Sequence, residues 1–365
     1  MINKLVFANL KHRPIRTLLS LVAIGVEVTM ILTLVGLSEG TLEDSARRAR
    51  GVGADVVLRA PNTSLLSASP ATISAKSMLD FLLQQPHVQM ATGTVVYPIG
   101  LLTTVTGLDL EEFDRMSGGF KFVAGQRFQK PDDIIVDEYY AMQNGLKLGS
   151  TVSLLNRKWV IRGIVEPGKL ARVILPRAVL QDMISANGKF SQVFVKLDDP
   201  ANISPVIASL KKLLPDYPIY SVPELASLYS VDSIPELRVF IKVVIGLSVV
   251  VGFLVVFLSM YTAVLERTRE IGILKALGAS PAYVLNLVFR ETIVLAIAGA
   301  VIGIFLTYGS RLAIEVLAPA TLRQKIVPHW WPIATGIAVA GALLGAMYPA
   351  WKAARQDAIE ALSYE

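Results

Sequence analysis

The sequence predicts a multi-pass α-helical membrane protein with four transmembrane helices and a large extracytoplasmic α+β domain between the first and second helices. Hydrophobic residues make up 53% of the 365 residues and charged residues 18%, which is too apolar for an ordinary soluble enzyme. Four windows of about 20 apolar residues have the length needed to cross a bilayer. Between the first two windows, strand-like and helix-like patterns alternate irregularly, as in an α+β domain.

The four apolar windows place transmembrane helices at residues 17–37, 238–264, 292–309 and 332–350. The first window is longer than the roughly 7–15 apolar residues of a cleaved signal peptide, so we expect an uncleaved anchor. Aromatic residues flank the fourth window at both ends, which is typical of an interfacial aromatic belt. These residues are Trp330, Trp331, Tyr348 and Trp351.

Residues 1–16 predict an amphipathic elbow helix on the cytoplasmic side of the first span. Ile2, Leu5, Val6 and Leu10 fall roughly on one face, and Pro14 then bends the chain. This pattern is typical of a helix that lies in the interface against membrane lipid before the chain turns into the bilayer. A disordered basic leader is the alternative.

The distribution of Lys and Arg predicts the orientation, because short cytoplasmic loops carry an excess of these residues. Basic residues are found in residues 1–16, in the loop 265–291 and in the tail 351–365, where we expect a terminal helix. We therefore expect both termini in the cytoplasm, an extracytoplasmic loop at residues 310–331 and a location in the bacterial inner membrane. The net charge of +6 reflects this topology and indicates no nucleic-acid partner.

The insert, residues 38–237, predicts an independent domain with a mixed set of elements. Asp137 is expected to cap a helix that runs to Asn144 and ends at Gly145. A hairpin is expected to turn at Asn156 and Arg157. The expected strands are 54–60, 92–97, 101–106, 134–136, 151–155, 158–165, 193–197 and 219–222, and two further helices are expected at 75–85 and 204–214.

The most informative segment is ERTREIGILKALGASP, residues 266–281, which directly follows the second apolar window. Alternating charge on an amphipathic pattern indicates a short cytoplasmic helix presented to a soluble partner. Gly278 has the position of a helix C-cap glycine, and Ser280 followed by Pro281 is typical of the start of the next helix. An ordinary charged loop is the alternative. The segment offers Glu266, Arg267, Arg269, Glu270 and Lys275 as solvated charges and Ile271, Leu274 and Leu277 as an apolar stripe.

Glu27 is an intramembrane carboxylate near the middle of the first apolar window. An ionised carboxylate there costs at least about 2–3 kcal/mol. Glu27 is therefore either a functional group in a cavity at the subunit interface, paired with a basic or hydroxyl group, or a tolerated side chain that is protonated or hydrogen-bonded within the helix bundle. The third and fourth windows contain Gly299 and Gly303, and Gly341 and Gly345, at the G-x-x-x-G spacing that favours close helix packing.

The sequence contains no cysteine and three scattered histidines, so it predicts no disulfide, iron–sulfur or thiolate metal site. No P-loop and no nucleophile or metalloprotease motif is found in these residues. We therefore expect no catalytic residue and no metal or cofactor bound by this polypeptide.

Three segments carry a resemblance to a known family. They are NLKHRPIRTLLSLVAIGV at the first span, ERTREIGILKALGAS behind the second, and YPAWKAARQDAIEALSYE at the end of the chain. Part of the insert, DDIIVDEYYAMQNGLKLGSTVSLLNRKWVIRGIVEPG, contributes to it. The chain resembles the MacB/FtsX/LolC-type permeases of the ABC transporter superfamily. Residues 51–130 depart most from the family pattern.

The resemblance implies a division of labour. A second permease copy or a paralogue would pair with this chain. A separate cytoplasmic ATPase dimer would bind ATP and Mg²⁺. The segment from Glu266 to Gly278 would be the coupling helix that contacts this ATPase. Hydrolysis would move the extracytoplasmic domain to export or extract a lipoprotein, peptide, lipid or drug-like substrate, with or without a periplasmic adaptor. Two alternatives are an FtsX-like mechanotransmitter that regulates an extracytoplasmic hydrolase, and a receptor or scaffold that works without an ATPase.

Overall fold

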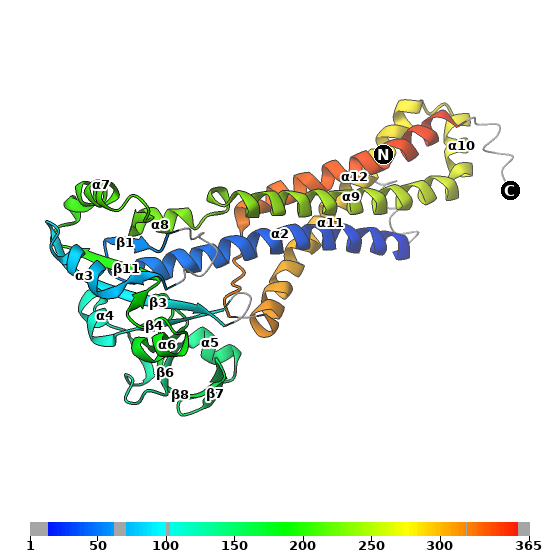
Figure 1. The fold of residues 1–365 in the computed structure, drawn as a ribbon. Coiled ribbons are helices and arrows are strands. Elements are labelled where there is room, and N and C mark those ends of the chain that lie inside the picture. Colours follow the sequence, from blue (N-terminus) through cyan, green and yellow to red (C-terminus); the bar gives the residue numbers. More distant parts are fainter. Residues whose placement is uncertain (1–13, 62–70, 100–102, 319, 357–365) are drawn as a thin grey trace. The chain divides into compact units, whose positions relative to one another are not determined.

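The computed structural model describes residues 14–61, 71–99, 103–318 and 320–356, and it divides into two compact units (Figure 1). The membrane unit comprises Met1–Ser38, Pro235–Ile314 and Gln324–Glu365, and the α/β unit comprises Glu39–Ile234 and Glu315–Arg323. Most of the expected elbow helix, and the end of the expected terminal helix, lie outside the described residues. We describe each unit by itself.

The membrane unit is built from long apolar helices. Among the described residues, four helices are long and apolar enough to cross a membrane, which confirms the four-span prediction. They are α2 (Pro14–Arg50), α9 (Pro235–Glu266), α11 (Pro281–Leu317) and α12 (Trp331–Arg355), and the short helix α10 (Thr268–Ala276) lies between α9 and α11 in the chain. The helices extend beyond the apolar windows because hydropathy marks only the part suited to lipid, whereas residues of good helix propensity continue the helix past it.

The helices of the membrane unit approach one another at glycines. A Cβ at Gly303 of α11 would lie 2.6 Å from the backbone oxygen of Gly25 in α2, and the Thr29 hydroxyl donates a hydrogen bond to the Gly303 carbonyl at 3.0 Å. A Cβ at Gly345 of α12 would lie 2.7 Å from the backbone oxygen of Phe253 in α9. The expected close packing is confirmed at Gly299, Gly303 and Gly345, where a larger residue would separate the helices, but not at Gly341, whose Cβ would meet its nearest atom at an ordinary 3.6 Å.

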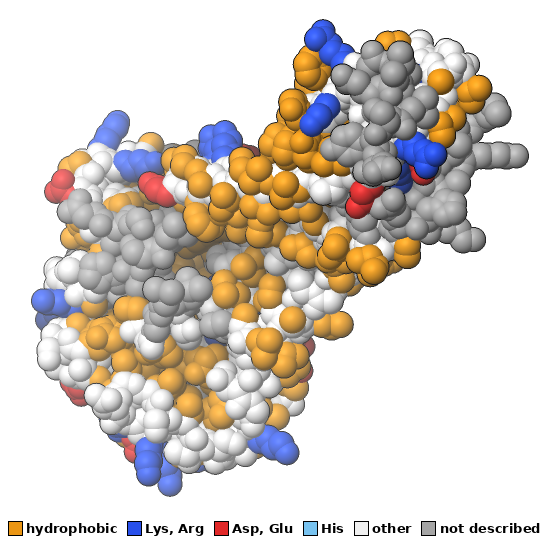
Figure 2. Space-filling model, turned by 90° about the vertical axis from the view of Figure 1, so that its right-hand side faces the viewer, with side chains coloured by type: hydrophobic (Ala, Val, Ile, Leu, Met, Phe, Trp, Pro, Cys, Tyr) orange, Lys and Arg blue, Asp and Glu red, His pale blue; other side chains and the backbone are white. Residues whose placement is uncertain are grey.

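The surface of these helices is largely apolar. Large hydrophobic side chains are exposed along α2, α9 and α11, and Figure 2 shows hydrophobic side chains gathered over broad areas of one face. Exposure of such apolar areas to water is unfavourable, so they are typical of surfaces that face lipid or another chain.

The α/β unit is organised around a mixed sheet. Its described residues form a ten-stranded sheet in the order β12-β1-β11-β3-β4-β9-β6-β8-β5, with β7 also paired to β8. The β4–β9 and β6–β8 pairs are parallel, and the other pairs are antiparallel. The strands are β1 (Val56–Arg59), β3 (Val88–Pro98), β4 (Thr104–Leu108), β5 (Phe122–Gly125), β6 (Asp133–Asp137), β7 (Thr151–Leu154), β8 (Arg157–Val165), β9 (Val173–Pro176), β11 (Gln192–Leu197) and β12 (Ile219–Ser221).

Both faces of the sheet are buried, and alternate residues point to different cores. In β1, Val56 and Leu58 belong to one cluster and Val57 to the other. The first cluster is covered by α3 (Ala75–Leu83), α5 (Glu138–Gln143), α6 (Arg177–Met183) and α7 (Ile203–Leu213), and the second by α4 (Leu110–Ser117) and α8 (Val222–Leu228). The short strands β2 (Ile73–Ser74) and β10 (Lys189–Phe190) pair separately, and 3-10 helices occupy Pro200–Asn202, Val231–Ser233 and Pro328–Trp330.

Most expected elements of this unit are present, with three differences. The expected hairpin of residues 92–97 and 101–106 is found as β3 paired with β4, but both strands have different bounds. The turn between β7 and β8 is formed by Leu155 and Asn156, both with positive φ, because Arg157 already pairs with Leu154. The elements α4, α6, α8, β2, β5, β9 and β10 were not predicted, although α4 has Asp109 and Gly118 as its caps and α8 has a capping box of Ser221 and Glu224.

We predict that Gly303→Ala weakens the membrane unit whereas Gly309→Ala in the same helix does not. The added methyl at position 303 would overlap the Gly25 carbonyl, whereas nothing lies within 4 Å at position 309. Overpacking of this kind costs about 1–3 kcal/mol. The measurement is the thermal denaturation midpoint of the detergent-solubilised chain. Equal midpoints for the two variants would contradict the close approach of α2 and α11.

Candidate functional site

The corner between α9 and α11 is the candidate site. A single residue, Arg267, separates the end of α9 from the start of α10, and its backbone (φ −106°, ψ 14°) interrupts the helix. The Thr268 hydroxyl donates back to the Val264 carbonyl at 3.3 Å, and the Ile271 N–H donates to the Arg267 carbonyl at 2.9 Å. The chain therefore changes from one helix to the next without a loop, so that a displacement of α10 acts directly on α9.

The other end of α10 is closed by a Schellman motif. Gly278 has φ +94°, its N–H donates to the Lys275 carbonyl at 2.9 Å, and the Ala279 N–H donates to the Leu274 carbonyl at 3.0 Å. The Ser280 hydroxyl then accepts from the Tyr283 N–H at 3.2 Å, one residue before α11 begins at Pro281. The caps expected from the sequence are confirmed.

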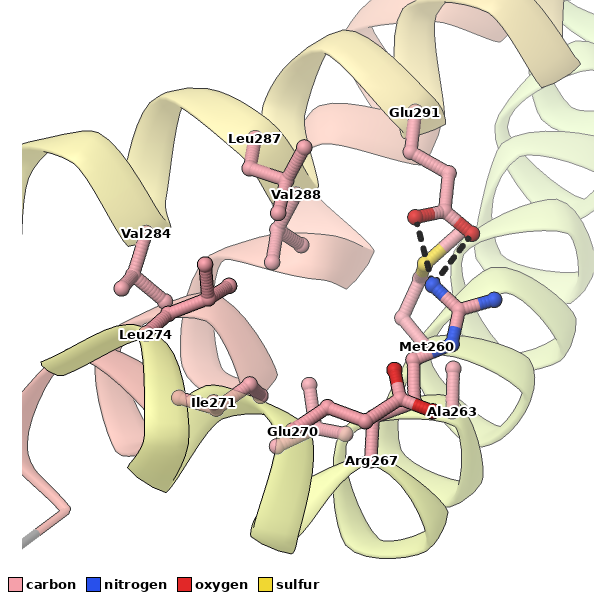
Figure 3. A pocket seen from close by; sticks show the side chains of 11 residues that line it. Met260, Ala263, Arg267, Glu270, Ile271, Leu274, Val284, Leu287, Val288 and Glu291 are labelled. Carbon is pink, nitrogen blue, oxygen red and sulfur yellow. Dashed lines mark hydrogen bonds and ion pairs between the residues drawn. The ribbon is translucent and has the colours of Figure 1, made fainter. Parts of the chain in front are cut away.

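The inner side of the corner encloses a groove of about 610 Å³, open to solvent, between α9, α10 and α11 (Figure 3). Its walls are mostly apolar, and three wall residues, Val264, Ile271 and Val284, form a buried cluster with Ala353. The lining residues are Met260, Ala263, Val264, Arg267, Glu270, Ile271, Leu274, Val284, Leu287, Val288 and Glu291.

An ion pair crosses the groove at one end. Nη1 of Arg267 lies 2.9 Å from Oε2 and 3.2 Å from Oε1 of Glu291 in α11 (Figure 3). Glu291 is buried and Arg267 is partly buried, so water screens the pair poorly. The expectation that Arg267 is a solvated charge is wrong, because the one-residue corner turns its side chain inward toward α11.

Lys275 is also turned toward the rest of the chain. Its Nζ donates to the backbone oxygens of Ala354 and Gln356, both at 2.6 Å, at the C-terminal end of α12. These carbonyls have no partner within the helix, and a cation there also interacts favourably with the helix dipole. The sequence placed Lys275 in solvent because no local pattern shows that α12 ends beside α10.

The expected apolar stripe is divided between two faces of α10. Ile271 is buried and Leu274 faces the groove, whereas the Leu277 side chain is 81% exposed. Ile273, which the sequence did not single out, is also exposed. Glu270 is exposed as well but lines the groove. We call the exposed residues outside the groove lining, Glu266, Arg269, Ile273, Leu277 and Gly278, the outer face of the corner.

Glu27 lies inside the helix bundle of the membrane unit. It is 6% exposed, and its carboxylate packs against Gly252 of α9, where a Cβ would overlap it. Within the residues that the structure describes, Oε1 of Glu27 has no hydrogen-bond partner. The role of Glu27 therefore stays a prediction, and Gly252 is a neighbour of its carboxylate that the sequence did not reveal.

The α/β unit contains a second buried charge cluster, around Arg172. This side chain is 1% exposed, and it donates to Asp137 at 2.8 Å and to Asp44 of α2 at 2.6 Å. Burial raises the pKa of Asp137 more than the Arg172 guanidinium lowers it. Tyr139 lies under both Arg172 and Arg323, which are 5.4 and 3.9 Å from its ring centre.

The Arg172 cluster joins segments that are far apart in the sequence. Asp44 lies in the part of α2 that belongs to this unit. Arg323 follows α11, and its backbone N–H donates to the Thr41 hydroxyl at 3.3 Å. Removing one member of a buried pair leaves an uncompensated charge and costs about 3–5 kcal/mol. The sequence could not reveal this cluster, because each residue alone is typical of a solvated surface. Among the described residues, no group of acidic or histidine side chains has the arrangement of a metal site.

Comparison with family models covers both units. Residues 17–213 match the MacB-like periplasmic core domain, and residues 242–358 match the FtsX-like permease C-terminal region. The chain belongs to the MacB/FtsX-type family of ABC transporter permeases. The family match includes α2 as well as the α9–α10–α11 corner.

The chain is similar to several curated relatives. The macrolide export ATP-binding/permease protein MacB of Escherichia coli is 23% identical over 389 residues, which cover 98% of this chain and 59% of that protein. MacB of Nitrobacter winogradskyi is 24% identical over 397 residues, again covering 98% and 59%. The uncharacterized ABC transporter permease YknZ of Bacillus subtilis is 37% identical over 125 residues, which cover 33% of this chain and 30% of that protein.

Two solved domains also match. The periplasmic region of MacB from Actinobacillus actinomycetemcomitans has a TM-score of 0.36 at 18% identity and covers 47% of this chain and 91% of its own. The extracellular domain of YknZ from Gram-positive bacteria has a TM-score of 0.34 at 16% identity, covering 46% and 99%.

We predict that the effects of substitutions at Glu27 and Gly252 on stability are not additive. Gly252→Ala overlaps the Glu27 carboxylate and lowers stability by about 1–3 kcal/mol, whereas the same change in a chain that also carries Glu27→Ala costs much less. Gly246→Ala is the matched control, since nothing lies within 4 Å of that glycine in the same helix. The measurement is a double-mutant cycle on the denaturation midpoint in detergent. Strict additivity of the two changes would rule out the packing described.

Proposed function

We propose that this chain is the permease component of an ATP-driven transporter in the bacterial inner membrane, with the corner at α10 as the docking element for a cytoplasmic ATPase. The observation that carries the proposal is the division of α10 into a fixed inner side and an exposed outer face. An exposed leucine beside charged residues on a fixed helix is suited to binding a partner, because little conformational entropy is lost on association.

The fixation of α10 supports a mechanical role. Ile271 packs in the core behind the groove, Lys275 bonds to the end of α12, and the Arg267–Glu291 pair connects the corner to α11. A force applied to Leu277 would therefore act on three membrane-spanning helices together. ATP and Mg²⁺ would be bound by the partner, because the residues of this chain contain no P-loop.

The Arg172 cluster supports transmission to the α/β unit. Asp44 belongs to α2, which like α11 contributes residues to both units, and Arg172 holds it by a buried ion pair. A displacement of α2 would move this part of the α/β unit because separating Asp44 from Arg172 is costly. We therefore propose that the extracytoplasmic domain moves in response to ATP hydrolysis.

The packing of the membrane unit favours work at the extracytoplasmic side over conduction through the bundle. Glycines bring α2 against α11, and polar side chains bond to one another, as in Ser20 with Ser259 at 2.6 Å and Thr33 with Ser310 at 2.8 Å. We propose export or extraction of a lipoprotein, peptide, lipid or drug-like molecule. The exposed apolar faces of α2 and α9 would pair with a second permease copy or a paralogue.

An FtsX-like mechanotransmitter that regulates an extracytoplasmic hydrolase is the second candidate. The match of residues 242–358 to the FtsX-like permease C-terminal region supports this candidate. The matched region contains the corner at α10, which a mechanotransmitter would use as a transporter would. Crosslinking from the α/β unit to a hydrolase instead of a transported molecule would distinguish the two.

We predict that Ile273→Ala/Leu277→Ala weakens binding of the co-purifying ATPase by at least about tenfold, in the range of interface hot spots, without changing the stability of the chain. Both side chains are exposed, so their truncation leaves the fold intact. The measurements are ATPase affinity, ATPase stimulation and the denaturation midpoint. Met142→Ala, an equally exposed apolar residue of the α/β unit, is the control and leaves all three unchanged. Unchanged affinity in the double variant would refute docking at the outer face.

We predict that single cysteines report the orientation, since the chain has none of its own. A membrane-impermeant maleimide added to intact cells lacking an outer-membrane barrier should label Met142→Cys and leave Leu277→Cys unlabelled until the cells are lysed. Both residues are exposed on the chain, so in cells without the partner ATPase their accessibility differs only by the side of the membrane. Labelling of Leu277→Cys from outside would invert the topology and exclude a cytoplasmic ATPase at α10.

A further inference from the structure

Five aromatic side chains form a continuous ladder on adjoining faces of α9 and α12. On α9, the rings of Phe253, Phe257 and Tyr261 follow one another with centres 6.2 and 5.9 Å apart. On α12, Tyr348 lies 6.0 Å from Phe257 and 6.3 Å from Tyr261, and Trp351 lies 6.4 Å from Tyr348. The rings therefore form one connected surface along two helices. An interfacial aromatic belt can consist of separate residues, so the connected surface is a further feature.

The ladder is accessible from outside the bundle. Tyr348 is 50% exposed and Trp351 is 47% exposed, while the three rings of α9 are partly buried. The α9 part extends over eight residues, or about 12 Å of helix. This is within one leaflet, because the hydrocarbon core of a bilayer is about 30 Å thick. A surface of this length suits the acyl chain of one lipid better than a membrane-spanning helix, whose contact would continue into the other leaflet.

Two cations stand at the end of the ladder. Nζ of Lys352 donates to the Tyr261 hydroxyl at 3.0 Å and lies 4.8 Å from the centre of the Tyr261 ring. The guanidinium of Arg355 lies 4.4 Å from the centre of the Trp351 ring. Both side chains are exposed. Two of the nearby carbonyls, which would repel an anion, already accept from Lys275; they are those of Ala354 and Gln356.

We propose that this surface binds one anionic phospholipid, with its phosphate at Lys352 and Arg355 and an acyl chain along the aromatic ladder. The Tyr261 hydroxyl accepts from Lys352, so its own proton is oriented to donate to a phosphate oxygen. Basic residues beside a membrane helix attract anionic headgroups, and amphipathic aromatic rings are favoured at headgroup level. The leaflet is the inner one if the orientation proposed above holds, but the binding itself does not depend on it.

Native mass spectrometry of the full detergent-purified chain tests this site. The chain is titrated with phosphatidylglycerol and, separately, with phosphatidylcholine of the same acyl composition. We expect one phosphatidylglycerol per chain to bind in preference to phosphatidylcholine. Lys352→Gln/Arg355→Gln should weaken phosphatidylglycerol binding by about fivefold for each charge removed and abolish the preference. Trp351→Leu should weaken both lipids, because it shortens the ladder without changing charge.

Lys242→Gln/Arg290→Gln is the charge-matched control, because it removes two exposed basic residues away from the ladder. It should keep the preference, which distinguishes a site from a general effect of net charge. Equal binding of the two lipids by the unaltered chain, or an unchanged preference in Lys352→Gln/Arg355→Gln, overturns the proposal. Competition by millimolar glycerol phosphate as effective as by the lipid would show a site for free phosphate and also overturns it. The denaturation midpoint of each variant confirms that the fold is retained.

Discussion

The contact between Arg267 and Glu291 at the corner determines how the rest of the membrane unit can respond to a partner. If the corner were an ordinary loop, α10 could move while α9 and α11 stayed in place. Instead, one residue connects α9 to α10, and that residue is ion-paired to α11. Breaking such a partly desolvated pair is expensive because it leaves a charge where water screens it poorly. The helices on both sides of the corner are therefore constrained to move with it.

Close backbone packing imposes a second constraint, since helices joined at glycines can slide or tilt only as a packed pair. Gly303 contacts the backbone of α2, and Gly345 contacts that of α9. Glu27 is located in this packing, where Gly252 provides the space for its carboxylate. A buried Oε1 without a hydrogen-bond partner among the described residues is unfavourable, so a rearrangement that gives Oε1 a donor would be stabilised by that hydrogen bond.

The sequence was most informative where local chemistry decides the structure. Gly278, Ser280 and Pro281 predicted both caps of the corner because capping depends on residues a few positions apart. Asp137 was correctly expected to cap α5, and its side chain accepts from the Tyr140 N–H at 2.8 Å. What remained hidden depends on contacts between distant residues. Arg267, Lys275 and Leu274 had the pattern of a solvated amphipathic helix, and only the positions of α11 and α12 show that they face inward. The expected roles of the α10 residues in ATPase coupling, and that of Glu27, remain predictions.

The contacts that hold α2 differ in strength between its two parts. In the membrane unit α2 is held by apolar packing and by single hydrogen bonds such as that from Thr29 to Gly303, and each such bond is worth about 1 kcal/mol net. In the α/β unit it is held by the buried pair of Asp44 and Arg172, whose disruption costs several times more. A single hydrogen bond of α2 in the helix bundle is therefore easier to exchange than its ion pair in the α/β unit. Thr29 can thus change its hydrogen-bond partner at a smaller cost than the separation of Asp44 from Arg172.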